Sequence, residues 1–267
     1  MLPGVYLAYK KNGTAYYRSN ITFQNKHISL GSFATEQEAH QAYQDAACLL
    51  FDPSTAIHDV FSLSTILSFH KVISLLNFRD NHIYFKNPIY LKNNYFVYYL
   101  SPTEELKFDI DDLFYYSNRK IMRRQGHLFV NDYGMQVNIL SRYGIKNYAV
   151  AGRDYYFVNE DPCDFRYSNI VVINRYYGVT RIDSSNGRTY QVQIHINGNY
   201  MVGRYQQEEM AAIAYNKAVD LAKKNGISKN FQMNYVEKYS PREYAEIYSN
   251  IKVSEKYLNY LKRFNPI

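Results

Sequence analysis

The sequence predicts an α+β protein with two small modules, each a three-stranded antiparallel sheet packed on one helix. Two observations predict it. Short alternating strands precede a helical pattern near both ends of the chain, and both stretches carry the same residues in the same order. We expect a mixed middle domain of β-hairpins and helices between the modules, and a helical tail after the second. The expected boundaries are residues 1–52, 53–174, 175–231 and 232–267.

The second module shows the clearest strand pattern. Its middle strand should place Tyr190, Val192, Ile194 and Ile196 on one face and Gln191, Gln193 and His195 on the other. Asn186-Gly187 and Asn197-Gly198 are typical of type I′ hairpin turns, which need positive φ at both central residues. A helix follows, and Gly226 is its expected C-cap. One face of the sheet should be buried on this helix while the other stays open.

The first module repeats this order. Gly4-Val5 corresponds to Gly178-Val179, and Leu30-Gly31-Ser32-Phe33 corresponds to Val202-Gly203-Arg204-Tyr205. Asn12-Gly13 should turn the first hairpin, and Thr35 with Glu38 should form a capping box at the helix. A solenoid would need adjacent repeats of short period, so these distant copies indicate two separate modules.

Charge and composition restrict the class of protein. A net charge of +7 and a pI of 9.1 favour an anionic partner such as nucleic acid, although a mildly basic solvated surface explains them equally well. Cys48 and Cys163 have no Cys or His neighbours at metal-ligand spacing, which argues against a zinc finger or a disulfide framework. The sequence has no signal-peptide core and no apolar run that could span a bilayer. We expect a soluble cytoplasmic, nucleoid-associated protein without a cofactor.

The middle domain and the tail are predicted from apolar spacing and caps. Ser62–Phe78 is too apolar for a lone surface helix and must pack on other elements. Residues 95–99 and 106–110 alternate as strands. The basic residues within 118–124 either contact phosphates or form a solvated loop. Ser240-Pro241 and Ser254 should each begin a short helix of a tail docked on the second module.

The two modules resemble the Apetala-two/ethylene-response-factor DNA-binding domain. In the first copy the matching residues are Gly4-Val5, Tyr17-x-Ser19-x-Ile21, Leu30-Gly31-Ser32-Phe33 and Glu38-Ala39…Ala42-Tyr43…Ala46-Ala47. In the second copy they are Gly178-Val179, Tyr190-x-Val192-x-Ile194, Val202-Gly203-Arg204-Tyr205 and Ala211-Ala212…Ala214-Tyr215-Asn216-Lys217-Ala218. The resemblance covers roughly a third of the chain. It implies a three-stranded sheet on one helix and a double-stranded DNA partner whose major groove receives the sheet.

The resemblance assigns the open sheet faces to DNA. The expected residues of the first face are Tyr6, Ala8, Asn20, Thr22, His27 and Ser29, with Lys10, Lys11, Arg18 and Lys26 nearby for phosphates. The expected residues of the second are Thr180, Gln193, His195, Asn199 and Met201, with Arg175, Arg181, Arg188 and Arg204 nearby. The plant domains carry arginines and tryptophans here, whereas Asn, Gln and Thr favour adenine edges and thymine methyl groups, and so A·T-rich sites. The alternative is that Gln193, His195 and Thr22 are ordinary exposed strand residues.

Residues 140–170 resemble the core of an H-N-H homing endonuclease. The matching residues are Leu140-Ser141-Arg142, Tyr156-Phe157-Val158-Asn159-Glu160-Asp161 and Asp164-Phe165-Arg166…Asn169-Ile170. Ser141 and Phe157 replace histidines of that pattern, so we predict no catalytic residues and no enzymatic activity. Asp154, Asp161 and Asp164 can either gather Mg²⁺ or serve as turn and capping carboxylates.

Three functional hypotheses follow. The favoured one is a sequence-specific double-stranded DNA-binding protein, a bacterial or phage transcriptional regulator that reads the major groove with its sheet faces. The second is an H-N-H-type homing endonuclease with residual metal-dependent DNA cleavage. The third is a protein- or RNA-binding module that uses tyrosine-rich faces, since the chain has 30 tyrosines.

Overall fold

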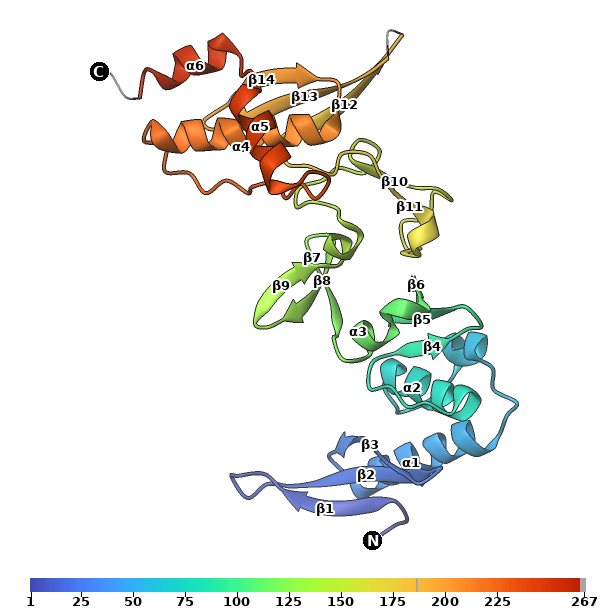
Figure 1. The fold of residues 1–267 in the computed structure, drawn as a ribbon. Helices are drawn as coiled ribbons and strands as arrows, with labels where there is room; N and C mark the ends of the chain where they lie inside the picture. Colours follow the sequence, from blue (N-terminus) through green and yellow to red (C-terminus); the bar gives the residue numbers. More distant parts are fainter. Residues whose placement is uncertain (186, 265–267) are drawn as a thin grey trace. The chain divides into compact units, whose positions relative to one another are not determined.

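The computed structural model is an α+β protein of helices and small antiparallel sheets, as predicted (Figure 1). It describes residues 1–185 and 187–264, without the side chain of Phe61. The chain divides into two compact units, Met1–Ile139 with Asn159–Asn169, and Leu140–Val158 with Ile170–Ile267. Within the described residues, no helix is long and apolar enough to cross a membrane.

The first unit begins with the first module. Its elements are β1 (Val5–Tyr9), β2 (Ala15–Phe23), β3 (Lys26–Phe33) and α1 (Glu36–Phe51), and the strands pair in the order β1-β2-β3. The predicted capping box of Thr35 and Glu38 begins α1. The chain turns at Asn12-Gly13 as predicted, within the loop 10–14 between β1 and β2. Gly13 has positive φ there, and its N–H donates to the Lys10 carbonyl at 2.9 Å.

A second helix covers α1 in this unit. After η1 (Ile57–Ser62), α2 (Phe69–Asn81) begins seven residues later than the helix predicted from Ser62. The Asp45 carboxylate accepts the Thr65 hydroxyl at 2.6 Å and the Ile66 N–H at 2.9 Å, which holds this stretch out of a helix. The buried side of α2 shares one apolar core with α1 and the first sheet.

Two further three-stranded sheets complete the first unit. Their elements are β4 (Ile89–Leu91), β5 (Tyr95–Ser101), β6 (Glu104–Asp109), η2 (Ile110–Asp112), α3 (Leu113–Ser117), β7 (Ile121–Arg124), β8 (His127–Asp132) and β9 (Met135–Asn138). The loop 159–169 runs along β6, where the N–H of Lys107 donates to the Cys163 carbonyl at 2.9 Å. Phe165 of this loop is buried and stacks on Phe108, with ring centroids 5.4 Å apart.

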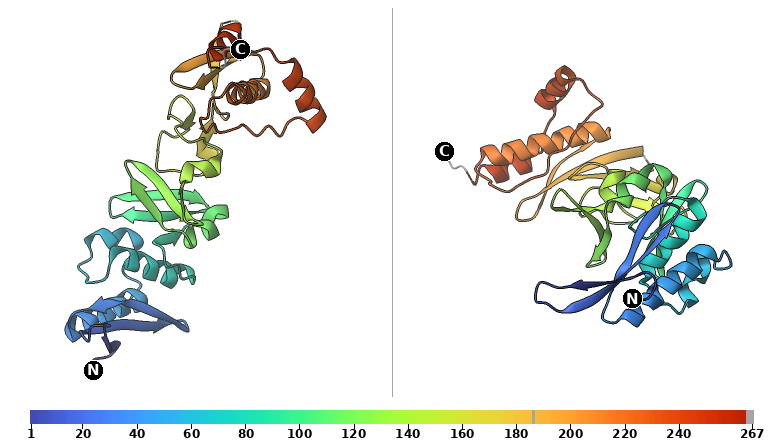
Figure 2. Two further views of the ribbon diagram at one scale, coloured as in Figure 1. Left: turned by 90° about the vertical axis from the view of Figure 1, so that its left-hand side faces the viewer. Right: turned by 90° about the horizontal axis from the view of Figure 1, so that it is seen from below.

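The second unit contains the second module. Its elements, together with the short helices that adjoin the unit boundary, are η3 (Ile139–Tyr143), β10 (Tyr155–Phe157), η4 (Tyr167–Asn169), β11 (Ile170–Val172), β12 (Val179–Ser184), β13 (Gly187–His195), β14 (Asn199–Tyr205) and α4 (Glu208–Lys224). Buried Val179, Val192 and Ile194 face α4, which lies along one side of the sheet (Figures 1 and 2). Gly226 ends the helix with φ +84°, as predicted.

Both turn predictions in this module need correction. Ser184 pairs with Gly187, which therefore lies in β13, and Asn186 lies outside the described residues. Gly198 has no positive φ, and His195 pairs with Asn199 across the longer loop 196–198. At Asn197-Gly198 a two-residue type I′ turn does not form, because three residues rather than two separate His195 from Asn199.

The tail packs on the second module. Ser240 and Ser254 cap α5 (Pro241–Asn250) and α6 (Glu255–Leu261) as predicted. Tyr257 is buried against α4, and its hydroxyl donates to the Ala218 carbonyl at 2.7 Å. The N–H of Ser254 donates to the Val202 carbonyl at 2.7 Å, so the tail also covers part of the edge of β14.

Candidate nucleic-acid interface

The two sheets have the same local geometry. Each has a β-bulge in the pairing of its second and third strands, after Ser19 in the first sheet and after Val192 in the second. The residue that follows the bulge donates its N–H to a glycine carbonyl, from Asn20 to Gly4 at 3.0 Å and from Gln193 to Gly178 at 2.8 Å. Positions in the two sheets can therefore be compared one by one.

The open face of the first sheet carries the residues predicted for it. Directly paired residues lie on the same face of an antiparallel sheet. The pairs on the open side are Tyr6 with Arg18, Ala8 with Tyr16, Asn20 with Ser29, and Thr22 with His27. Arg18 thus lies on the face itself, and its guanidinium donates to the Tyr16 hydroxyl at 2.7 and 3.1 Å. Tyr16 was missed as a face residue, although strict alternation along β2 would have placed it there.

Lysines lie at both ends of the strands of this sheet. Lys10 and Lys11 belong to the exposed loop between β1 and β2. Lys26 begins β3 at the opposite end, where it pairs with Phe23 on the helix side. Its ammonium lies 5.6 Å from the centre of the Tyr84 ring. The preceding turn, Gln24-Asn25, has positive φ at both central residues, as a type I′ hairpin turn requires. Lys10 and Lys11 therefore flank the open face at one end only. The expectation that Lys26 lies near this face was wrong, because it pairs with Phe23 on the opposite side of the strand.

The open face of the second sheet also carries its predicted polar residues. The pairs on this side are Thr180 with Gln191, Gln191 with Arg204, Gln193 with Met201, and His195 with Asn199. His195 Nδ1 and Asn199 Oδ1 lie 2.9 Å apart, and Arg204 Nη2 donates to Gln191 Oε1 at 3.3 Å. Gln191 was not among the predicted contact residues, although the alternation of β13 already placed it on this face.

Two predicted phosphate contacts lie on the opposite side of the second sheet. Arg181 pairs with Tyr190, and Arg188 pairs with Asp183, at positions that share the face of Val179. Both guanidinium groups donate to the Asp183 carboxylate, at 2.9 and 3.0 Å. The expectation that they flank the open face was therefore wrong. Residues two apart in a strand lie on the same face, so Arg181 and Asp183 share the helix side with Val179, and Arg188 lies opposite Asp183 on that side.

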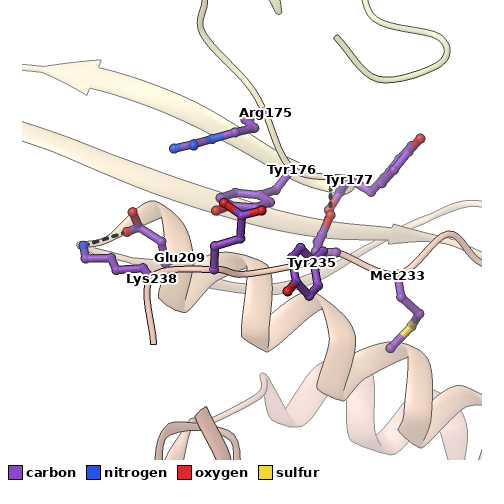
Figure 3. Close-up of a pocket in the computed structure, with 9 residues that line it drawn as sticks. Arg175, Tyr176, Tyr177, Glu209, Met233, Tyr235 and Lys238 are labelled. Carbon is purple, nitrogen blue, oxygen red and sulfur yellow. Dashed lines mark hydrogen bonds and ion pairs between the residues drawn. The ribbon is translucent and has the colours of Figure 1, made fainter. Parts of the chain in front are cut away.

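Arg175 is also engaged away from the open face. It precedes β12 and lies in a pocket of about 410 Å³ beside the N-terminal end of α4 (Figure 3). Its guanidinium lies over the Tyr176 ring at 5.1 Å and reaches Glu208 at 3.4 Å. In the same pocket Lys238 pairs with Glu209 at 3.1 Å. The cations of this pocket thus have carboxylate partners, and the predicted phosphate role of Arg175 is not supported by its position.

Charge is distributed unequally between the two sides of each sheet. The strand positions on both open faces, as the described pairings define them, include no Asp or Glu. Acidic residues of the modules lie in the helices, as with Glu36, Glu38 and Glu208, or on the helix side, as with Asp183. Each sheet therefore presents a polar face without negative charge.

The loop 159–169 is held by a dense set of hydrogen bonds. Asp164 is fully buried and accepts from Arg166 at 2.6 and 2.8 Å and from Asn159 at 2.9 Å. Burial acts to raise the pKa of the Asp164 carboxyl, but hydrogen bonds and the charge of Arg166 hold it below its ordinary value. Asp161 accepts from Lys107 at 3.1 Å and from the Cys163 N–H at 2.9 Å. These contacts support the capping interpretation of both carboxylates.

Asp154 belongs to the second unit. It is buried there and accepts from Arg153, Asn174 and the Val150 N–H.

Within residues 1–185 and 187–264, no three His, Cys, Asp or Glu side chains form a group that could hold a metal ion. Comparison of the chain with protein-family models, curated proteins and solved structures found no match.

Proposed function

We propose that the protein binds double-stranded DNA in a sequence-specific manner and acts as a transcriptional regulator of the bacterial or phage type. The observation that carries this proposal is the pair of open sheet faces, which display amide, hydroxyl, imidazole and guanidinium groups and no carboxylate. A surface of this kind suits the edges of bases inside a polyanion. The resemblance to a domain that lays its sheet in the major groove supports the same conclusion.

Asn20 and Gln193 are the best candidates for base contacts. They occupy the same position after the bulge, and each backbone is fixed by a hydrogen bond to a glycine carbonyl. Asn and Gln side chains can donate and accept two hydrogen bonds with adenine in the major groove. Two equivalent amides in one chain favour a bipartite site with adenine in each half, read without dimerisation.

Sequence-independent affinity comes from the cations around these faces. In the first module they are Lys10, Lys11 and Arg18, and in the second Arg204 lies on the face itself. Each cation that neutralises a phosphate releases counterions, which makes binding weaken as salt rises.

Selection of bound duplexes from a random DNA pool, followed by titration over a salt series, tests the proposal. We expect enrichment of a bipartite A·T-containing site and an affinity that falls steeply with salt. Binding of duplex DNA without enrichment of any sequence would contradict sequence-specific recognition. An affinity for duplex DNA that is insensitive to salt would instead favour the protein- or RNA-binding hypothesis.

The proposal gives the middle segment no catalytic role. Phe157 cannot accept a proton from water, and Asp161 and Asp164 already bind Lys107, Arg166 and Asn159. Incubation of the selected duplex with Mg²⁺ or Mn²⁺ should leave it intact. Metal-dependent nicking that disappears in Asp161→Asn or Asp164→Asn would overturn this part and support an endonuclease.

A further inference from the structure

A groove of about 530 Å³ lies beside β7 in the first unit, outside both modules. It is lined by residues of β5, β6, β7 and β8. Three of its lining side chains are the cations Lys120, Arg123 and Arg124, which belong to the basic segment 118–124. The structure thus gathers most of that segment's positive charge along one concavity.

Positive charge exceeds negative charge in this groove. Its one lining carboxylate, Glu104, forms an ion pair with Arg123. The fourth cation of the segment, Arg119, pairs with Asp132 at 2.9 Å. Among the described residues, Lys120 and Arg124 form no ion pair, and both are exposed. An anionic ligand would supply negatively charged oxygen atoms with which these two side chains can form ion pairs.

The floor of the groove is apolar and neutral. Tyr98 and Ile121 are buried there, and the Tyr98 hydroxyl accepts the Ile121 N–H at 3.1 Å. Burial raises the pKa of Tyr98 to about 12, so its hydroxyl adds no negative charge at neutral pH. Charges beside such a floor are screened less than charges surrounded by water.

The cations of the groove are spread in a row along one segment of the chain and are not clustered at a single position. Lys120 and Arg124 are four residues apart in sequence, and an extended chain rises about 3.3 Å per residue, so the row spans roughly 13 Å. Each strand of duplex DNA carries one phosphate per 3.4 Å of helix axis. Neighbouring phosphates of one strand are farther apart than this rise because the backbone winds around the axis, so the row is long enough to reach more than one phosphate of a strand.

We propose that this groove binds the sugar-phosphate backbone of the DNA duplex without reading its bases. The inference rests on the proposed function, since the duplex is the same one whose bases the modules read. It assigns to the middle of the chain a contribution to affinity that is independent of sequence.

The test compares two variants of the full chain by titration with the selected duplex and with an unrelated duplex over a salt series. The groove variant is Lys120→Ala/Arg124→Ala, and the matched control is Arg242→Ala/Lys256→Ala, which removes two exposed cations from α5 and α6. The groove variant should bind both duplexes roughly tenfold more weakly, and its salt slope should be lower by about 2. The control should bind like the wild type, and thermal unfolding should show that both variants fold.

The outcomes separate this inference from the proposed function. If the wild type binds duplex DNA and the groove variant binds it as tightly as the control does, the groove assignment is wrong and the proposed function stands. A changed base preference in the groove variant would overturn backbone binding. The same variants are also titrated with single-stranded RNA, and a loss of affinity in the groove variant that is confined to RNA would overturn the choice of duplex DNA. Failure of the wild type to bind any duplex would overturn both proposals.

Discussion

Gly178 lies so close to the ring of Tyr215 that a Cβ on the glycine would overlap ring atoms. Its φ is +69°, and its carbonyl accepts the N–H of Gln193 at 2.8 Å. Gly4 has the same relationship with Tyr43 in the first module. In each module a glycine therefore joins the first strand, the helix and the bulge that presents an amide on the open face.

Replacement of this glycine should destabilise the second module. In Gly178→Ala the positive φ costs about 1 kcal/mol, and displacement of the packed ring costs about 2 kcal/mol more. Urea unfolding should therefore show a loss of about 3 kcal/mol. Gly198→Ala is the control, since nothing lies within 4 Å of its Cβ position and its φ is not positive. Equal losses in the two variants would contradict the explanation.

The buried Ser19 hydroxyl should be a weak point of the first module. Ser19 is fully buried, and its Oγ has no hydrogen-bond partner among the described residues. Val192 occupies the equivalent position in the second sheet and is also fully buried. Ser19→Val should raise the free energy of unfolding by about 1 kcal/mol, because it removes a desolvated hydroxyl and adds apolar contact. A destabilised variant would show that the site lacks room for the extra methyl groups.

The free energy of unfolding should depend on pH through the carboxyl group of Asp164. Its pKa is held below the ordinary value, so its contribution is present above about pH 4 and is lost as the pH falls below that value. Asp164→Asn leaves the Arg166 charge without its partner and should cost roughly 3 kcal/mol at pH 7. Urea unfolding between pH 3 and 8 should show this difference shrink only at the acidic end. The exposed Asp111→Asn should show no such difference.

Two arginines on opposite faces of one sheet offer a matched test of DNA binding. Arg204 lies on the open face, whereas Arg181 lies on the helix side and binds Asp183. Arg204→Ala should weaken DNA binding several-fold and lower the salt slope by about 1. Arg181→Ala should leave both quantities close to those of the wild type. The reverse result in the same titration would place DNA on the other face of the sheet.

Removal of an amide should change base preference rather than general affinity. Gln193→Ala should lose discrimination at one position of the selected site, worth about 1–3 kcal/mol. Asn20→Ala should do the same in the other half-site, because the two residues occupy equivalent positions. The exposed Gln44→Ala of α1 serves as control. Repeated selection with each variant measures the change, and an unchanged site would refute direct reading by these side chains.

Prediction from sequence succeeded where a pattern was local. The capping residues Thr35, Ser240 and Ser254 were found because a cap and its partner lie within a few residues. The start of α2 was missed because Asp45, which binds Thr65 and Ile66, is some 20 residues distant in sequence. The hairpins of the second module form between the expected strands, but their loops differ from the predicted two-residue turns, because strand pairing rather than the Asn-Gly dipeptide sets where each loop begins.

The sequence by itself determined the α+β class, the repeat and the side of each strand that stays open, because alternation with a period of two is a local property. Only the tertiary structure decided which cations are available at these faces. Arg175 and Arg188 have carboxylate partners on the helix side, while Arg18 and Arg204 lie on the open faces. The groove beside β7 likewise depends on packing between separate sheets, which no local pattern specifies.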